Sequence, residues 1–201
     1  SRPQHRERFD LLFVDEAGQL ALANAVAAGT VARGIVLLGD PQQLPQVNKA
    51  SHPDGAGASV LGHLLGGADV VPPDRGVFLD VTWRMHPDVC RFPSERSYDG
   101  RLRSAPQCAR RRIKASGALR GAGLRVVAVE HEGCSQQSVP EAEAIATLCR
   151  ELLDGSATVT DEEGETAALM PHDILVVAPY NLARRCIQQL VPAGVRVGTV
   201  D

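Results

Sequence analysis

The chain has 201 residues with a formal net charge of -3 at pH 7, and 44% of its residues are hydrophobic. This length and composition allow a sizeable core in one large domain or two small ones, and they exclude a strong overall basic field. No apolar segment approaches the roughly 20 residues that span a bilayer, and residues 1–10 do not have the pattern of a leader. We therefore expect no membrane partner, a cytoplasmic setting, and free thiols at the five scattered cysteines.

The first third of the chain predicts two buried parallel strands with a helix between them. The predicted elements are a core strand at residues 9–14, a short helix at 21–28 and a second core strand at 35–38. Asp15 and Glu16 follow the first strand directly, and a polar loop from Asp40 to Gln43 follows the second. In open α/β sheets ligands bind at the carboxyl ends of the strands, so we expect these polar residues at one rim.

The residues at this rim are of the types that nucleotide hydrolysis uses. Asp15 could hold Mg²⁺ through a water shell, while Glu16 orients or deprotonates the attacking water. Gln43 could hydrogen-bond the γ-phosphate or the attacking water. An acidic pair is also common at strand ends without any catalytic role. Asp40 likewise has two readings, since it could bind the nucleotide or cap the turn before Pro41.

Beyond residue 56 the chain alternates helical and strand-like segments, as a parallel sheet with crossover helices requires. Residues 66–75 are rich in Gly, Asp and Pro, so we read them as a linker and place the boundary between two lobes there. The acidic segment at residues 158–166 has a central turn and predicts a hairpin or a loop. The other predicted elements are helices at 56–65, 140–153 and 181–190 and strands at 77–81, 124–129, 174–178 and 195–200.

Three sequence motifs resemble motifs II, III and the arginine motif of superfamily 1 helicases: VDEAGQ at residues 14–19, GDPQQLP at 39–45 and TWRMHP at 82–87. The likeness is to the group that includes the nonsense-decay RNA helicases and the Okazaki-fragment nuclease-helicase. A narrower likeness is to the helicase half of bacterial fusions that carry a RecB-type nuclease domain. The resemblance runs from Phe9 to Asp201.

This resemblance implies a fold, cofactors and partners. The expected fold is α/β, with RecA-like P-loop NTPase lobes built on parallel sheets. Residues 1–70 would be the C-terminal part of a first, incomplete lobe, and residues 76–201 a nearly complete second lobe that ends at the start of motif V. The implied cofactors are ATP and Mg²⁺. The implied partners are single-stranded DNA, or RNA, and a fused or associated RecB-type nuclease domain.

The TWRMHP motif carries the third part of the expected active site. By resemblance, Arg84 follows a strand as an arginine finger that neutralises charge on the transferring phosphoryl group. Trp83 stands where relatives often have Tyr, and its flat face could stack on adenine. The alternative is that Trp83 is a core aromatic residue and Arg84 a surface ion-pair partner. We read His86 as a packing or hydrogen-bonding residue, because it has no partner at metal-ligand spacing.

Contact with nucleic acid has two candidate locations. By resemblance, Tyr180 and Asn181 in VVAPYN and Thr199 in VGTVD lie near the bound strand, although relatives often carry Gln after the PYN run, where this chain has Leu182. The second candidate is the densest basic stretch, which could bind phosphate or be a solvated surface loop. This basic stretch consists of Arg101, Arg103, Arg110, Arg111, Arg112 and Lys114.

The sequence lacks the phosphate-binding loop of an ATPase lobe. No run of the form GxxxxGK followed by Ser or Thr occurs in the chain, so nothing in it cradles the β-phosphate. We therefore expect the 201 residues to be an excerpt or a truncated product that is inactive alone. Two hypotheses stay open: part of an ATP-driven translocase on single-stranded nucleic acid, or a non-catalytic remnant that serves as a binding or docking module.

Overall fold

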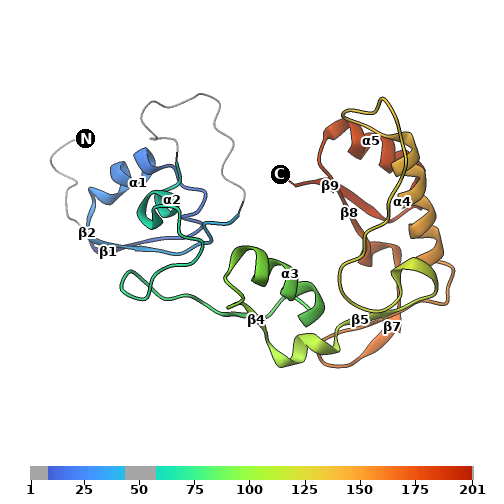
Figure 1. The fold of residues 1–201 in the computed structure, drawn as a ribbon, viewed down its shortest axis with the longest axis horizontal. Coiled ribbons are helices and arrows are strands. Elements are labelled where there is room, and N and C mark those ends of the chain that lie inside the picture. Colours follow the sequence, from blue (N-terminus) through green and yellow to red (C-terminus); the bar gives the residue numbers. More distant parts are fainter. Residues whose placement is uncertain (1–8, 44–57, 201) are drawn as a thin grey trace. The chain divides into compact units, whose positions relative to one another are not determined.

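The computed structural model describes residues 9–43 and 58–200, and these residues form two compact units (Figure 1). Unit 1 comprises the described residues of Ser1–Asp80 together with Ser94–Arg101, and unit 2 those of Val81–Pro93 and Leu102–Asp201. Each unit contains a parallel strand pair with helices, which confirms the predicted α/β class. The proposed lobe boundary at residues 66–75 stays a prediction.

Unit 1 is built on the parallel strands β1 (Phe9–Val14) and β2 (Ala32–Leu37), which the helix α1 (Leu22–Gly29) connects. The first strand and the helix lie within a residue of their predicted bounds. The second strand begins three residues earlier than predicted, at Ala32. Gly34 lies in this earlier part of β2, where a Cβ would lie 3.0 Å from Leu11 Cδ2 on β1. A glycine that permits close strand packing gives no apolar signal in the sequence.

The core of unit 1 lies between the sheet and two helices. Ala17, Ala25 and Val60 are buried there, and apolar side chains of both strand ends pack against them. The helix α2 (Val60–Leu65) begins at Ser59, whose Oγ accepts a hydrogen bond from the backbone N–H of Gly62 at 3.0 Å. The predicted helix at 56–65 is therefore confirmed for its last six residues, while residues 56 and 57 lie outside the described part of the chain.

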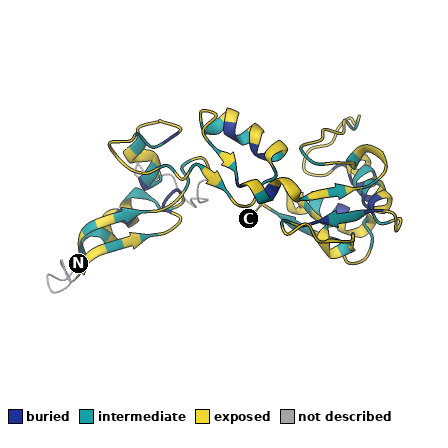
Figure 2. Cartoon of the chain, turned by 90° about the horizontal axis from the view of Figure 1, so that it is seen from below, coloured by how far each residue is buried: buried dark blue, intermediate teal, exposed yellow. Residues whose placement is uncertain are grey.

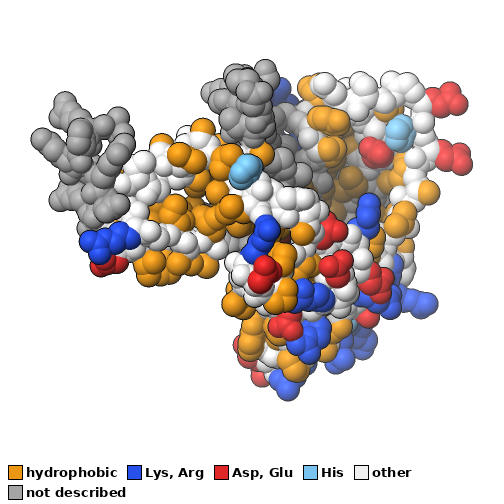
Figure 3. All heavy atoms as spheres, turned by 60° about the vertical axis from the view of Figure 1, so that its left-hand side comes forward, with side chains coloured by type: hydrophobic (Ala, Val, Ile, Leu, Met, Phe, Trp, Pro, Cys, Tyr) orange, Lys and Arg blue, Asp and Glu red, His pale blue; other side chains and the backbone are white. Residues whose placement is uncertain are grey.

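The other face of the β1–β2 sheet is open. Phe9, Leu11 and Phe13 alternate along β1 and are 55–63% exposed, and Figure 2 shows exposed residues along both strands. Figure 3 shows hydrophobic side chains gathered on the surface of unit 1. Within the described residues, no further strand pairs with β1 or β2. Open apolar faces and unpaired edges of this kind are an aggregation liability.

Gly18 is required by the close approach of two loops in unit 1. A Cβ at this position would lie 2.2 Å from the carbonyl oxygen of Asp40 and 2.9 Å from its carbonyl carbon. We expect Gly18→Ala to destabilise the chain by about 1–3 kcal/mol, because the backbone of Asp40 must shift to relieve the overlap. Gly198→Ala is the control, since a Cβ there meets nothing within 4 Å. Urea unfolding of both variants measures the difference, and equal midpoints would contradict this account.

Unit 2 contains three separate sheets and most of the helices. One parallel pair consists of β3 (Val81–Thr82) and β4 (Arg103–Ser104), and the other of β8 (Leu175–Ala178) and β9 (Arg196–Thr199). The antiparallel sheet consists of β5 (Arg112–Lys114), β6 (Thr158–Thr160) and β7 (Thr166–Ala168). The two long helices are α4 (Val139–Leu152) and α5 (Asn181–Leu190). The helix α3 (Pro87–Ser97) begins in unit 2, and its residues from Ser94 onward cluster with unit 1. The predicted helices at 140–153 and 181–190 and the acidic hairpin at 158–166 are confirmed.

One core cluster of unit 2 lies between the two long helices and the β8–β9 pair. Ala142 of α4, Ala178 of β8 and Ile187 of α5 are buried together, and small residues let the two helices approach the sheet closely. α4 begins at Ser138, whose Oγ accepts the backbone N–H of Glu141 at 3.3 Å. Among the described helices, none has both the length and the apolar character that crossing a bilayer requires.

Two predicted strands are wrong. Of residues 77–81 only Val81 is in a strand, while Val77 and Leu79 are more than three-quarters exposed. Residues 124–129 form no strand, and Val126 is 97% exposed. Both predictions rested on apolar runs, which indicate burial but do not supply a pairing partner. In the described structure β8 pairs only with β9, and Arg125 instead donates to the carbonyl oxygens of Leu124 and Arg120.

Candidate functional site

The carboxyl ends of β1 and β2 bring the predicted acidic rim together within unit 1. The strand register pairs Val14 with Leu37, and hydrogen bonds continue beyond it from Leu38 N to Val14 O and from Ala17 N to Leu38 O, both 2.8 Å long. Asp15 and Glu16 therefore lie beside the start of the loop that holds Asp40. The backbone N–H of Gln43 donates to Asp40 O at 3.4 Å, which places Gln43 in the same turn.

The backbone of the acidic pair has an unusual conformation. Glu16 has φ 53°, in the left-handed region that side chains rarely adopt, at a cost of about 1–3 kcal/mol. The turn is held by Asp15 Oδ1, which accepts Glu16 N at 2.9 Å, and by Glu16 O, which accepts Gln19 N at 2.9 Å. Ala17 is fully buried beneath the turn, while both carboxylates are exposed. The fold thus presents two acidic side chains to solvent from a fixed backbone.

Asp40 uses both carboxylate oxygens within unit 1. Its Oδ1 accepts the backbone N–H of Gln42 at 2.9 Å, and its Oδ2 accepts the hydroxyl of Tyr98 at 2.6 Å. This arrangement supports the structural reading, in which Asp40 caps its turn; the nucleotide-binding role of Asp40 stays a prediction. Tyr98 packs in turn against Phe78, with ring centroids 6.1 Å apart. Tyr98 was missed as a site residue, because it lies 58 residues from Asp40 in the sequence.

Burial and the hydrogen bond to Asp40 predict that Tyr98 loses its phenol proton at an unusually high pH. Burial raises the pKa of Tyr98 most, and the hydrogen bond and charge of Asp40 raise the pKa further. In a Tyr180→Phe chain Tyr98 is the only tyrosine. We expect its phenolate absorbance to appear only at a pH well above 10, which is about the ordinary pKa of tyrosine. The stabilisation linked to the raised pKa is fully present below that ordinary value and is lost as pH rises through the raised pKa.

Spectrophotometric titration at alkaline pH checks this result. Adding Asp40→Asn to the Tyr180→Phe chain should move the titration of Tyr98 toward the ordinary value, because the charged acceptor is gone. Titration of Tyr98 at the ordinary value in the chain that retains Asp40 would disprove the bond.

The loop that follows β3 exposes the side chains of Trp83 and Arg84. Thr82 O accepts Ala105 N at 2.8 Å, and Thr82 Oγ1 accepts Arg84 N at 3.3 Å. Trp83 is 67% exposed, so the alternative that it is a core aromatic residue is wrong. Within the described residues Arg84 forms no ion pair, and this gives no support to the surface ion-pair alternative. Both side chains are available to a ligand.

The histidine of the same motif has a structural role. His86 precedes α3, and its Nδ1 accepts the backbone N–H of Asp88 at 3.1 Å. The carbonyl oxygen of His86 accepts both Val89 N and Cys90 N at 2.9 Å. His86 therefore caps the helix, in agreement with the predicted hydrogen-bonding role.

Several residues of the basic stretch make contacts within the protein. Arg111 pairs with Glu162, Arg110 donates to the carbonyl oxygens of Glu162 and Glu163, and Arg101 lies 4.9 Å above the ring of Phe78. The hydrogen bond from Arg111 lowers the pKa of Glu162. Figure 3 shows basic and acidic side chains interspersed rather than gathered by sign. These contacts favour internal roles over phosphate binding for the three arginines.

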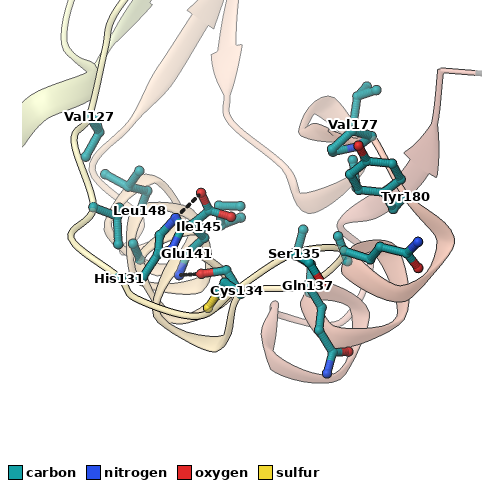
Figure 4. A pocket seen from close by; sticks show the side chains of 18 residues that line it. Val127, His131, Cys134, Ser135, Gln137, Glu141, Ile145, Leu148, Val177 and Tyr180 are labelled. Carbon is teal, nitrogen blue, oxygen red and sulfur yellow. Dashed lines mark hydrogen bonds and ion pairs between the residues drawn. The ribbon is translucent and has the colours of Figure 1, made fainter.

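The predicted nucleic-acid residues meet at the carboxyl edge of β8 and β9. The register pairs Ala178 with Thr199, and Tyr180 and Asn181 follow β8 at the start of α5. Tyr180 is half exposed and lines a cavity of about 470 Å³ in unit 2. Figure 4 shows Tyr180 beside Val177, with the ion pair of His131 and Glu141 on the other side of the cavity. The edge thus combines an aromatic face with polar groups.

Parallel strand pairs connected by helices, with polar residues at their carboxyl edges, define an α/β protein of the RecA-like P-loop class. The chain belongs to the AAA domain family, whose model matches residues 59–201. The model of the viral superfamily 1 RNA helicase core domain matches residues 1–57. The resemblance to superfamily 1 helicases is thereby confirmed.

The relatives of this chain include three proteins that are helicases by name. The probable helicase MAGATAMA 3 of Arabidopsis thaliana is 32% identical over 97 residues, or 47% of this chain and 11% of the relative. The helicase SEN1 of Saccharomyces cerevisiae is 30% identical over 100 residues, which are 49% of this chain and 4% of the relative. The DNA replication ATP-dependent helicase/nuclease DNA2 of Gallus gallus is 25% identical over 202 aligned positions, which cover 98% of this chain and 18% of the relative. The chain therefore spans less than a fifth of the length of each of these relatives.

Proposed function

We propose that this chain supplies hydrolytic and strand-binding residues to an ATP-dependent superfamily 1 translocase that acts on single-stranded DNA. The observation that carries the proposal is the rim of unit 1, where the hydrogen bond from Ala17 N to Leu38 O joins the acidic pair to the loop of Asp40 and Gln43. The chicken relative, whose name refers to DNA replication, matches nearly the whole chain, and this favours DNA over RNA. An attached RecB-type nuclease domain stays a prediction.

Each polar residue of the proposed active site has a distinct role. Glu16 orients and deprotonates the attacking water, and Gln43 hydrogen-bonds that water or the γ-phosphate. Arg84 stabilises the negative charge of the transferring phosphoryl group, and Trp83 stacks on the adenine. Residues 1–70 and 76–201 are proposed to belong to the first and second RecA-like lobes.

The donor set of the rim fits Mg²⁺. Within the described residues no group of three or more His, Cys, Asp or Glu side chains could enclose a metal ion. Mg²⁺ does not need such a group, because it retains several waters and binds through one or two carboxylates and the substrate phosphates. Asp15 would hold the ion with its exposed carboxylate, of which Oδ1 already accepts Glu16 N. When bound, the ion supplies charge neutralisation to the phosphates.

The strand-binding edge of unit 2 completes the proposal. Tyr180 offers an aromatic face for base stacking, which is worth about 1–3 kcal/mol per base in other proteins. Asn181 and Thr199 supply hydrogen-bonding groups at the same edge, and such groups can contact the phosphate or sugar of a strand. This edge is preferred over the basic stretch because three arginines of that stretch have partners within the protein.

The test is ATP hydrolysis by the full natural protein, since these 201 residues contain no phosphate loop. The rate is measured alone, with single-stranded DNA and with single-stranded RNA. We expect stimulation by DNA, and Tyr180→Ala should raise the DNA concentration that gives half-maximal stimulation. A protein that hydrolyses no ATP with either strand, and that Glu16→Gln does not change, would instead be a non-catalytic binding module.

A further inference from the structure

The backbone of the arginine motif is held at three points in unit 2. Two of them are the hydrogen bonds of Thr82 with Ala105 N and Arg84 N. The third is the carbonyl oxygen of Arg84 itself, which accepts a hydrogen bond from Nη1 of Arg111. The peptide groups on both sides of the exposed Arg84 side chain are therefore fixed, although the residue lies in a loop.

Arg111 is itself fixed by a bidentate ion pair. Its Nε lies 2.9 Å from Glu162 Oε2, and its Nη2 lies 2.9 Å from Glu162 Oε1. The guanidinium is planar and carries five donors, so these two bonds define its plane and leave Nη1 directed at Arg84 O. Lysine could not reproduce this geometry, because an ammonium group is a point charge without a fixed plane.

Glu162 lies on a hairpin turn that is internally bonded. Asp161 Oδ1 accepts the backbone N–H groups of Gly164 and Glu165, both at 2.9 Å, and the hydroxyls of Thr160 and Thr166 lie 3.0 Å apart across the two strands. β6 also pairs with β5, which follows Arg111 directly. The hairpin is thus a rigid support to which the Arg111–Glu162 pair attaches the arginine motif.

Stability alone does not account for this arrangement. The side chains of Arg111 and Glu162 are 30% and 39% exposed, and ion pairs at such exposure add little to folding. What the pair adds is geometric precision at Arg84 O, 27 residues earlier in the chain than Arg111. A displacement of a catalytic group by about 1 Å can cost about 10²-fold in rate.

We propose that Arg111, oriented by Glu162, is a positioning residue that fixes the backbone of Arg84 for phosphoryl transfer. The inference rests on the proposed function of Arg84. Arg111 acts through the carbonyl oxygen of Arg84 and does not touch the nucleotide. Its loss should therefore lower kcat and leave the KM for ATP and the affinity for single-stranded DNA unchanged.

The experiment is a double-mutant cycle on strand-stimulated ATP hydrolysis by the full natural protein. We expect Arg111→Met to lower kcat by about 10- to 100-fold, in the range that misplacement of a catalytic group produces. Arg111→Lys should lower kcat as well, because it loses the bidentate pair, and it serves as the second variant if Arg111→Met does not fold. In an Arg84→Ala background, Arg111→Met should cause no further loss, since residues that act as a unit are not additive. Arg150→Met, on the exposed side of α4, is the control.

The outcomes separate this inference from the proposed function. If Arg84→Ala abolishes stimulated hydrolysis while Arg111→Met and Arg111→Lys leave kcat unchanged, the positioning role is overturned and the proposed function stands. Losses that add fully in the double variant would also overturn it, because they would indicate a separate structural role. If Arg84→Ala has no effect, the proposed role of Arg84 fails, and the positioning role fails with it.

Discussion

Replacing Arg84 with alanine in the full natural protein is expected to lower the kcat of strand-stimulated ATP hydrolysis by about 10³- to 10⁵-fold. In its proposed role the guanidinium stabilises charge that develops on the phosphoryl group in the transition state, and alanine offers no substitute. The KM for ATP should change little, because this interaction strengthens only as the reaction proceeds. Single-turnover and steady-state hydrolysis rates, measured with saturating single-stranded DNA, test the expectation.

The matched control for Arg84→Ala is Arg91→Ala. Arg91 is an exposed arginine on α3, seven positions further along the chain, so its replacement removes the same charge from the same region. Arg84→Lys should recover only part of the rate, since an ammonium group cannot form the paired hydrogen bonds of a guanidinium. An equal, small effect of Arg84→Ala and Arg91→Ala would show that Arg84 is an ordinary surface residue.

The elements that the sequence predicts well are those whose signal is local. β1 and α5 have the predicted bounds, because an apolar run before an acidic pair and an amphipathic segment after a strand are readable in a short window. The strands predicted at 77–81 and 124–129 failed for the opposite reason. A strand needs a partner, and Val126 and Leu79 lack one in the described structure and remain exposed.

In the candidate site, too, residues with a local sequence signal were predicted and their distant partners were not. Asp15 and Glu16 were predicted at the rim from the strand that precedes them. The partners that hold the site in place were missed as site residues, because they are distant in sequence: Tyr98 bonds Asp40 from 58 residues away, and Glu162 binds Arg111 from 51 residues away. Arg111 belonged to a basic stretch with an open choice between phosphate binding and solvation. Neither alternative included an internal bond to Arg84, because charge patterning identifies cations but not the acceptors that face them.

The second large effect is expected for Glu16→Gln, which should lower kcat of the full natural protein by about 10²- to 10⁴-fold. Glutamine retains the size of glutamate but cannot accept the proton of the attacking water. The left-handed backbone of residue 16 holds the side chain at the end of β1. Glutamine can adopt the same backbone conformation at a similar cost in free energy. Binding of ATP should therefore persist while hydrolysis is lost, and a comparison of ATP affinity with hydrolysis rate measures both.

Asp10→Asn is the control for the carboxylate of Glu16, because Asp10 lies near the opposite end of β1. Its carboxylate is 93% exposed and lies 3.8 Å from Arg33, and exposed pairs of this kind contribute about 0–1 kcal/mol. This variant removes the same charge from the same strand without touching the rim. If Glu16→Gln and Asp10→Asn hydrolyse ATP at the same rate, Glu16 is not the catalytic base, and the left-handed turn that presents it has only a structural purpose.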